Sequence, residues 1–261
     1  MSAWALVGNR LALGVEPRDA VLGSRLTRAI HVDVERPGAA WLREDSQGFA
    51  RSAGRDRAPM SRNDSGRHSM IWRDDLGAAV QVRMYDRRRI WVPRRLAIPL
   101  PPSDVVATAG RIRRPVVFPG VAWDLVGGVT ALRSRVQQGG APVRWAWLFA
   151  RRPGEAEVVM RARADDRGEF LLVLGPATLA QAELDGEFEL DIEAFAPISP
   201  SPALDGDPLG DLLVETLAAP GDDDPVAEGR ADPPDDWMAI GIGRVTLELG
   251  RTVSDQVSLA F

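Results

Sequence analysis

Few side chains in this 261-residue sequence belong to the types that carry out catalysis. Cysteine is absent, and the histidines are His31 and His68. The lack of cysteine excludes disulfides, thiolate metal ligands, iron–sulfur clusters and cysteine nucleophiles. The two histidines are too far apart in sequence to share one helical face, so most zinc sites and serine-hydrolase triads lack the parts they need. The sequence therefore predicts a protein that is not an enzyme and holds no cofactor or metal ion.

Acidic residues gather in two places where carboxylates could act together. Asp205, Asp207 and Asp211 could offer oxygen ligands to calcium, but the bidentate glutamate of a calcium loop is missing. Glu183, Asp185 and Glu187 could do paired acid–base work, but no feature singles out a pair. We interpret both groups as solvated acidic segments.

The charged residues are distributed very unevenly along the chain. Residues 1–114 contain 21 arginines and 12 acids, a net charge of +9, whereas residues 115–261 contain 11 arginines and 25 acids, a net charge of -14. All 32 basic residues are arginine, which a GC-rich genome favours. The alternative is that the planar guanidinium fork serves bidentate contacts with carboxylate or phosphate groups.

The densest charge clusters are the candidate interface residues. They are Arg87, Arg88, Arg89, Arg94 and Arg95 in the basic half, and Asp222, Asp223, Asp224, Asp235 and Asp236 in the acidic half. We interpret them as surfaces that contact other protein subunits, including further copies of this chain arranged head to tail. Nucleic acid is disfavoured as a partner, because acids are interleaved with the arginines and no row of stacking aromatics accompanies them. At this stage the basic and acidic halves could pair within one chain or between chains.

Hydrophobic alternation predicts β-strands along most of the chain. In Glu187–Phe195 the apolar residues form one face and four acids form the other, and this acidic face must be solvated or contact arginines. In Val143–Phe149 three aromatic side chains share one face. Further strands are predicted at Ala29–Arg36, Ser69–Arg73, Ala79–Tyr85, Arg89–Pro93, Leu96–Leu100, Val129–Gln137, Glu157–Ala164, Glu169–Leu174, Ile242–Leu249 and Val257–Phe261. The segments Pro176–Leu184 and Pro208–Ala218 are the helix candidates.

The predicted fold class is all-β, with two tandem immunoglobulin-like or transthyretin-like β-sandwich domains and long irregular loops. We place a basic domain at residues 1–110 and a second domain at residues 115–261, with the junction near residues 103–120. An acidic loop is predicted at residues 197–236 of the second domain, and another loop at Ser46–Arg67.

The second half resembles the carboxypeptidase-regulatory-like, transthyretin-like β-sandwich domains over roughly 50 residues. The resemblance rests on Gly128–Leu132, on the turn Gly140-Ala141-Pro142-Val143 and on the hairpin Ala164–Leu172, which contains Asp166 and Gly168. Glycine, proline and aspartate suit these turns physically. The first half contains a weaker version of the same pattern, with a predicted hairpin at Asn63–His68.

A weaker resemblance concerns the setting of such modules. Small proteins of this kind, without cysteine or signal peptide, are similar to accessory subunits of bacterial phage-tail-like contractile injection particles, where they would sit at the cap or baseplate. The N-terminal residues show no secretory signal, and every window of 18 residues in the sequence contains a charged residue, which disfavours a membrane-spanning helix. The expected location is therefore the cytoplasm or a released particle. The sequence thus predicts a structural subunit of a larger assembly.

Two other functions stay open at this stage. The chain could be a module that binds carbohydrate or another cell-surface ligand through exposed tryptophans, of which it has eight. It could also be an accessory domain of an enzyme whose catalytic chain is separate.

Overall fold

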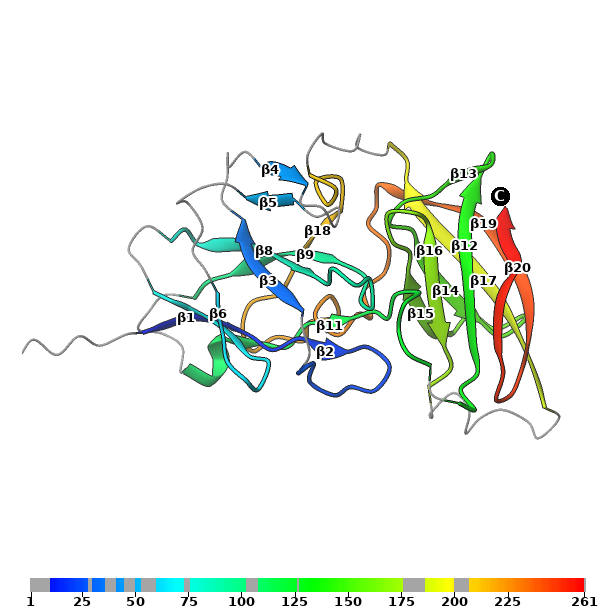
Figure 1. Cartoon of the computed structure of the whole chain (residues 1–261), viewed down its shortest axis with the longest axis horizontal. Coiled ribbons are helices and arrows are strands. Elements are labelled where there is room, and N and C mark those ends of the chain that lie inside the picture. The colour runs from blue at the N-terminus through cyan, green and yellow to red at the C-terminus, as the bar shows by residue number, and fades with distance from the viewer. Residues whose placement is uncertain are drawn as a thin grey trace, which may run out of the picture.

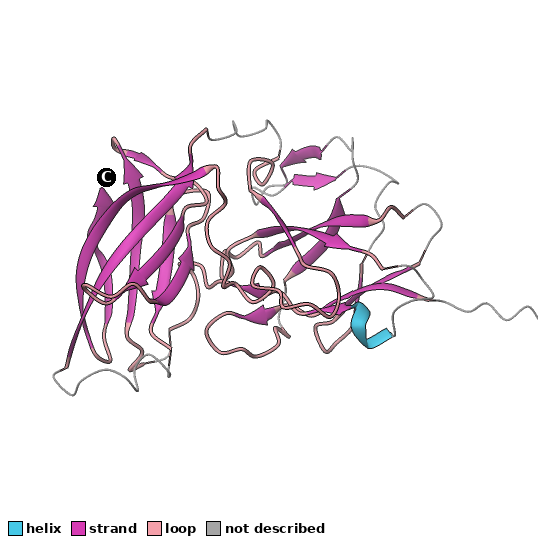
Figure 2. Ribbon diagram, turned by 180° about the vertical axis from the view of Figure 1, so that it is seen from behind, coloured by secondary structure: helices cyan, strands magenta, loops and turns pink. Residues whose placement is uncertain are grey.

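The computed structural model confirms the all-β prediction. It describes residues 10–27, 30–35, 41–44, 50–52, 60–72, 76–101, 108–125, 127–175, 186–199 and 207–260. These residues form strands β1 to β20 and one short 3₁₀ helix, η1 (Thr108–Arg111). Figure 1 shows two β-rich halves side by side along the long axis, and Figure 2 shows the same arrangement from behind.

The first half contains two four-stranded sheets that enclose one apolar core. Their strand orders are β10-β1-β7-β6 and β18-β9-β8-β3, with a small β11-β2 pair and a β4-β5 hairpin beside them. The strands are β1 (Leu11–Val15), β2 (Arg18–Asp19), β3 (His31–Glu35), β4 (Trp41–Glu44), β5 (Ala50–Ser52), β6 (Ser61–Arg62), β7 (His68–Ile71), β8 (Ala79–Tyr85), β9 (Arg94–Pro99), β10 (Ile112–Arg113), β11 (Val116–Val117) and β18 (Val214–Thr216).

The second half is a sandwich of two further sheets around its own core. One sheet has the order β15-β14-β17-β19, and in the other β12 lies between β20 on one side and β16 and β13 on the other. The strands are β12 (Ala131–Gln138), β13 (Ala141–Pro142), β14 (Trp147–Arg151), β15 (Val158–Arg163), β16 (Glu169–Val173), β17 (Glu187–Pro197), β19 (Trp237–Glu248) and β20 (Thr252–Ala260). Phe170, Leu148 and Ile192 are fully buried between the sheets.

Strand β17 shows how the period-two pattern becomes structure. Its apolar residues face the core, whereas Glu187 and Glu189 are exposed. Asp191 and Glu193 on the same outer face bind Arg244 of β19 and Arg151 of β14. The acidic face is therefore solvated at one end and paired with arginines at the other, as the alternation required.

The turns that carry the family resemblance are tight hairpin turns. Gly139 and Gly140 both have positive φ and connect β12 to β13, which is typical of a two-residue type I′ turn. Gly168 has φ +72°, and a Cβ atom there would lie 2.6 Å from the carbonyl oxygen of Val136. Asp165 accepts hydrogen bonds from the backbone N–H groups of Arg167 and Glu169 in the same turn. These features explain the glycines and the aspartate locally, and the membership of the family stays a prediction.

Three predicted elements were wrong. Pro208–Ala218 is not a helix, because its first residues form turns and Val214–Thr216 pairs in parallel with β9. Arg89–Pro93 is not a strand, because Arg89 takes the left-handed backbone region (φ 58°) in a turn. The strand predicted at Val143–Phe149 begins only at Trp147, because Trp145 has φ 60° and leaves the alternation. The helix candidate Pro176–Leu184 lies outside the described residues.

The acidic segment between β17 and β19 crosses from the second half to the first. Its strand β18 joins β9 with Glu215 opposite Leu96, and Leu217 and Ala227 lie in the core of the first half. Figure 1 places β18 next to β9. The first core thus takes residues from both sides of the boundary predicted at residues 110–115, and the division into two domains stays a prediction.

Candidate functional site

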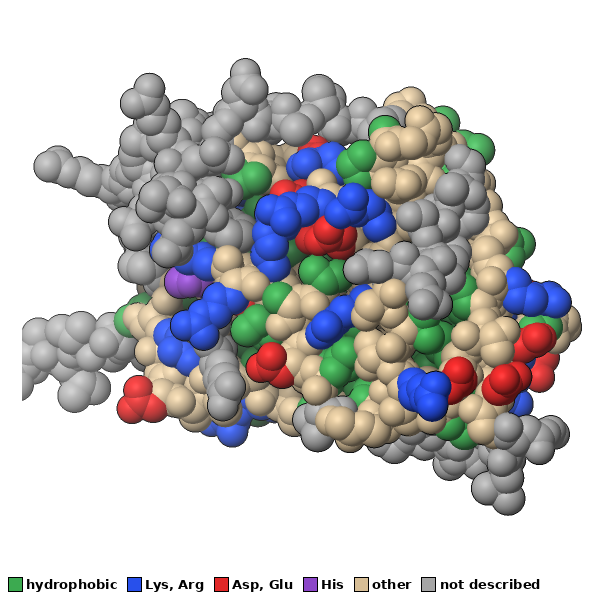
Figure 3. All heavy atoms as spheres, turned by 45° about the vertical axis from the view of Figure 1, so that its right-hand side comes forward, with side chains coloured by type: hydrophobic (Ala, Val, Ile, Leu, Met, Phe, Trp, Pro, Cys, Tyr) green, Lys and Arg blue, Asp and Glu red, His purple; other side chains and the backbone are tan. Residues whose placement is uncertain are grey.

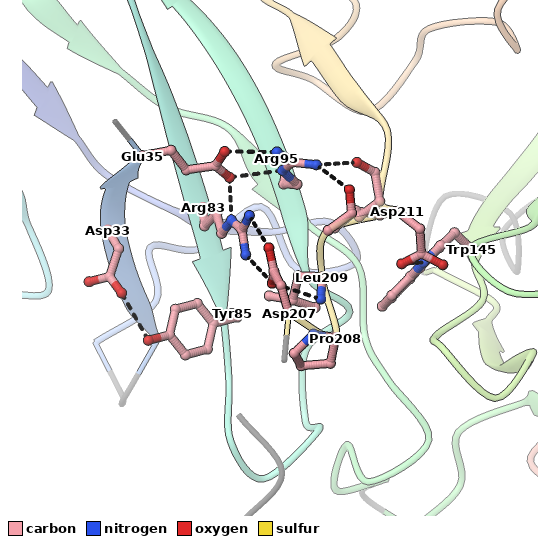
Figure 4. Close-up of polar contacts among 12 residues, drawn as sticks. Asp33, Glu35, Arg83, Tyr85, Arg95, Trp145, Asp207, Pro208, Leu209 and Asp211 are labelled. Atoms are coloured by element: carbon pink, nitrogen blue, oxygen red, sulfur yellow. Dashed lines mark hydrogen bonds and ion pairs between the residues drawn. The ribbon is translucent and has the colours of Figure 1, made fainter. Parts of the chain in front are cut away.

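A buried set of charges joins the acidic segment to the basic half (Figure 4). Arg83 of β8 binds Asp207 through two hydrogen bonds of 2.6 and 2.7 Å, and their side chains are 3% and 4% exposed. Arg83 also donates to Glu35 of β3. Arg95 of β9 binds the same glutamate with two bonds of 2.8 Å and donates to the carbonyls of Gly210 and Leu212 at 2.9 Å.

The neighbours of these groups keep them charged although they are buried. Burial alone would raise the pKa of Glu35, but the guanidiniums of Arg95 and Arg83 outweigh it and the pKa lies below its ordinary value. Burial would likewise lower the pKa of Arg83, but Asp207 and Glu35 raise it. The cluster is a mutually neutralising structural unit, with each charge satisfied by its partners.

Two further ion pairs fasten the same segment. Arg94 of β9 binds Glu215 of β18 at 2.8 and 2.9 Å and also donates to the carbonyls of Val116 and Val226. Arg113 of β10 donates to Asp224 and to the carbonyl of Ala218. Because these side chains are largely buried, each contact ties a stretch of the acidic segment to the first half.

The two halves also meet directly through charged and aromatic contacts. Arg89 binds Asp165 and Asp166 of the β15–β16 turn. Asp211 of the acidic segment accepts hydrogen bonds from Arg144 of the second half at 2.6 Å and from the indole N–H of Trp145 at 3.0 Å, so the segment is bound to both halves.

A small apolar cluster supports these polar contacts. Trp145 is buried with Tyr85 of β8 and Leu209 of the acidic segment. The left-handed turn at Trp145 therefore directs its ring toward the first half, away from the core of its own sandwich.

The interface residues predicted from the sequence differ in burial and in their partners within the chain. Arg89, Arg94, Arg95 and Asp224 bind partners within the chain. Arg87 is half-buried, and Asp223 is exposed and binds Arg230. Arg88, Asp222, Asp235 and Asp236 lie on the surface.

The basic and acidic parts of the sequence thus pair within one chain, and Figure 3 shows side chains of both signs interspersed on one face. This pairing removes the argument for head-to-tail contacts from the charge asymmetry. A contact role for the exposed residues stays a prediction.

The groups singled out for catalysis or metal binding have structural surroundings. Asp207 and Asp211 of the calcium-like set are held by Arg83 and Arg144, and Asp205 lies outside the described residues, as do Glu183 and Asp185. Over the described ranges, no group of three or more His, Asp and Glu side chains could hold a metal ion. His31 stacks on Tyr85 with ring centroids 5.1 Å apart, and His68 is buried.

Sequence reasoning missed the edge of the second sandwich. Strand β19 is twelve residues long, and within the described part of the chain it pairs with β17 on one side only. Met238 and Ile242 on this strand are 50% and 65% exposed. The sequence signal for this exposure is the interruption of the apolar–polar alternation around Gly241 and Gly243.

Comparisons with known proteins leave the family open. No family model matches the chain, and no curated protein matches it. Among solved structures, it is similar to the minor pilin GBS52 of Streptococcus agalactiae (8% identity, 77% of this chain and 66% of the pilin, TM-score 0.26). It is also similar to the TIE protein of Bacillus anthracis (8% identity, 95% of this chain and 34% of that protein, TM-score 0.24). Likenesses this distant carry no argument about function. In the described part of the chain, no helix is long and apolar enough to cross a membrane.

Proposed function

We propose that the protein is a non-enzymatic structural subunit of a larger protein assembly and that the edge of β19 makes the contact. The observation that carries this proposal is the side of the twelve-residue β19 that pairs with no strand among the described residues; this strand exposes Met238 and Ile242. An edge strand presents unpaired backbone N–H and C=O groups, which are a template for a strand from another chain.

The partner that suits this edge is a second copy of the same chain. Arg244, Thr246 and Glu248 alternate along β19 and are exposed on one face. If two β19 strands pair antiparallel with Thr246 opposite itself, the paired stretch runs from Arg244 to Glu248. Arg244, which binds Asp191 of its own chain, then also faces Glu248 of the other copy. Opposite charges directly across a strand pair are favourable, so the edge is self-complementary in this register.

The arrangement of the halves supports a structural role. The buried ion pairs of Arg83 and Arg94 fasten the acidic segment to the first half, and the cluster around Trp145 joins the halves directly. A body held together in this way can act as a spacer between neighbours. We extend the proposal to the cap or baseplate of a phage-tail-like contractile injection particle; this finer assignment rests on the sequence resemblance alone.

The described tryptophans give the carbohydrate-binding alternative no support. Trp91, Trp145, Trp147 and Trp237 are buried, and Trp72 and Trp123 are half-buried against apolar cores. A sugar platform needs an aromatic face open to solvent. We therefore put forward no second function.

Light scattering across protein concentration and salt tests the assembly role. We expect the mass to rise from one chain to two with concentration, and we expect Arg244→Glu or Glu248→Arg alone to prevent this because like charges then face each other. The double variant Arg244→Glu/Glu248→Arg should restore association. Glu155→Arg, an exposed acid on the β14–β15 turn, is the matched control and should have no effect.

Two results would count against the proposal. A single-chain mass at every concentration, with no partner recovered from lysate of the native host, would refute the structural role. Association that survives both single charge reversals would place the contact elsewhere than β19.

A further inference from the structure

Four arginines surround one carboxylate in the first half. Glu16, whose side chain is 6% exposed, accepts a 2.8 Å hydrogen bond from Arg67. Arg18, Arg25 and Arg114 approach the same carboxylate only to 3.5–3.6 Å. Four guanidiniums against one carboxylate leave a surplus of three positive charges, and three of the four contacts are at the limit of hydrogen bonding.

Acceptors for these guanidiniums are scarce as well. The Nε atoms of Arg18 and Arg25 are buried and have no hydrogen-bond partner among the described residues, and the same is true of Nη1 of the neighbouring Arg113. Buried N–H groups in proteins are nearly always satisfied. The described chain thus supplies too few anionic oxygens for the arginines that it gathers here.

Three of these arginines line an open pocket of about 530 Å³. Arg18, Arg113 and Arg114 lie beside Gly23 and Gly110, and the opposite wall contains Asp222, Asp224 and Glu228. Asp224 is buried and binds Arg113, whereas Asp222 and Glu228 are exposed. Arg18 and Arg114 are 41% and 48% exposed, so their guanidiniums are accessible. The volume is that of a small-molecule site.

We propose that this pocket binds a phosphate-bearing small molecule, with the phosphate group held by Arg18 and Arg114 and with Arg113 beside them. A phosphate dianion supplies both the negative charge and the acceptor oxygens that the cluster lacks. The planar guanidinium binds phosphate through two parallel hydrogen bonds, which makes arginine the preferred residue for this group. The proposal is independent of the assembly role of β19.

Calorimetric titration with inorganic phosphate tests the site, with ionic strength held constant by chloride. We expect saturable binding of one phosphate per chain, weakened about tenfold by Arg18→Gln or by Arg114→Gln. Arg251→Gln removes one exposed arginine far along the sequence and should leave the affinity unchanged. Asp222→Asn should tighten binding, because it removes a negative charge from the opposite wall.

Several outcomes would overturn the proposal. These are the absence of saturable phosphate binding, an equal loss in Arg251→Gln, and binding of citrate without binding of phosphate. Thermal unfolding of each variant checks that the fold is intact. If Arg18→Gln does not fold, Arg114→Gln decides, since among the described residues Arg114 has one ion pair, the long contact with Glu16.

Discussion

The ion pair between Arg83 and Asp207 should be the strongest single link between the acidic segment and the first half. Asp207→Ala removes both hydrogen bonds to a guanidinium that is 3% exposed and also removes an acceptor from the N–H of Leu209. Breaking a buried pair by deleting one partner costs 3–5 kcal/mol. Because Glu35 still binds Arg83, we expect the lower end of this range, about 3 kcal/mol.

Urea unfolding followed by tryptophan fluorescence and circular dichroism measures this loss. Glu169→Ala, which breaks the exposed pair with Arg135, is the control and should cost less than about 1 kcal/mol. The double variant Arg83→Met/Asp207→Leu should recover most of the loss, since an apolar pair of similar volume leaves no charge unpaired. If Asp207→Ala costs no more than the control, the reasoning about the buried pair is wrong.

Three further predictions concern single residues. Burial lowers the pKa of His68 from 6.5 to about 4, so the folded state favours the neutral imidazole. The unfolding free energy should therefore fall by about 3 kcal/mol as the pH drops from 6.5 to 4, and a pH series of urea unfolding should show that His68→Asn removes this dependence. Gly168→Ala should destabilise by about 3 kcal/mol, because its Cβ would meet a carbonyl oxygen at 2.6 Å, whereas Gly140→Ala faces open space and should cost about 1 kcal/mol in the same urea assay. Arg94→Met should cost about 3–5 kcal/mol, because it deprives the buried Glu215 of its bidentate partner. Arg163→Met should cost less, because Arg163 reaches the same glutamate through a single long contact of 3.4 Å, and burial lowers the pKa of Arg163; thermal unfolding at pH 7 would separate the two.

The alternation of apolar and polar residues predicted the strands and hairpins whose structure depends on residues close in sequence. The strand predicted at Ala79–Tyr85 matches β8, and the one at Glu187–Phe195 matches β17 to within its last two residues. Both have strict alternation over at least seven residues, so that a shift of one residue would turn the apolar side chains toward solvent. The hairpin at Asn63–His68 is also confirmed, because β6 and β7 pair antiparallel across it. Glycine is required in its turn, since Gly66 has φ +77° and a Cβ atom there would collide with the carbonyl oxygen of Leu26.

The same patterns gave wrong predictions where contacts between residues far apart in sequence determine the secondary structure. Residues 208–218 have helical spacing of apolar residues, but the parallel ladder with β9 and the buried pairs of Asp207 and Glu215 outweigh that propensity. Arg94 and Glu215 are 121 residues apart, and nothing in either local sequence indicates the other. The charge asymmetry was real, but its interpretation depended on a chain crossing that composition does not encode.

That crossing has a consequence for how the protein is made. The first half lacks the outermost strand of one sheet until β18 emerges from the ribosome, which happens after six strands of the second sandwich, β12 to β17, have been synthesised. During this interval β9 has a free side, and Arg83 and Arg94 have not met Asp207 and Glu215. During this stage the nascent chain has a sheet with an unpaired edge, and the arginines that are buried in the final fold are exposed. Pairing of this edge with a wrong strand is easiest at that time. A fragment that stops near residue 115 stays in this stage permanently, so we expect the two halves to fold together or not at all.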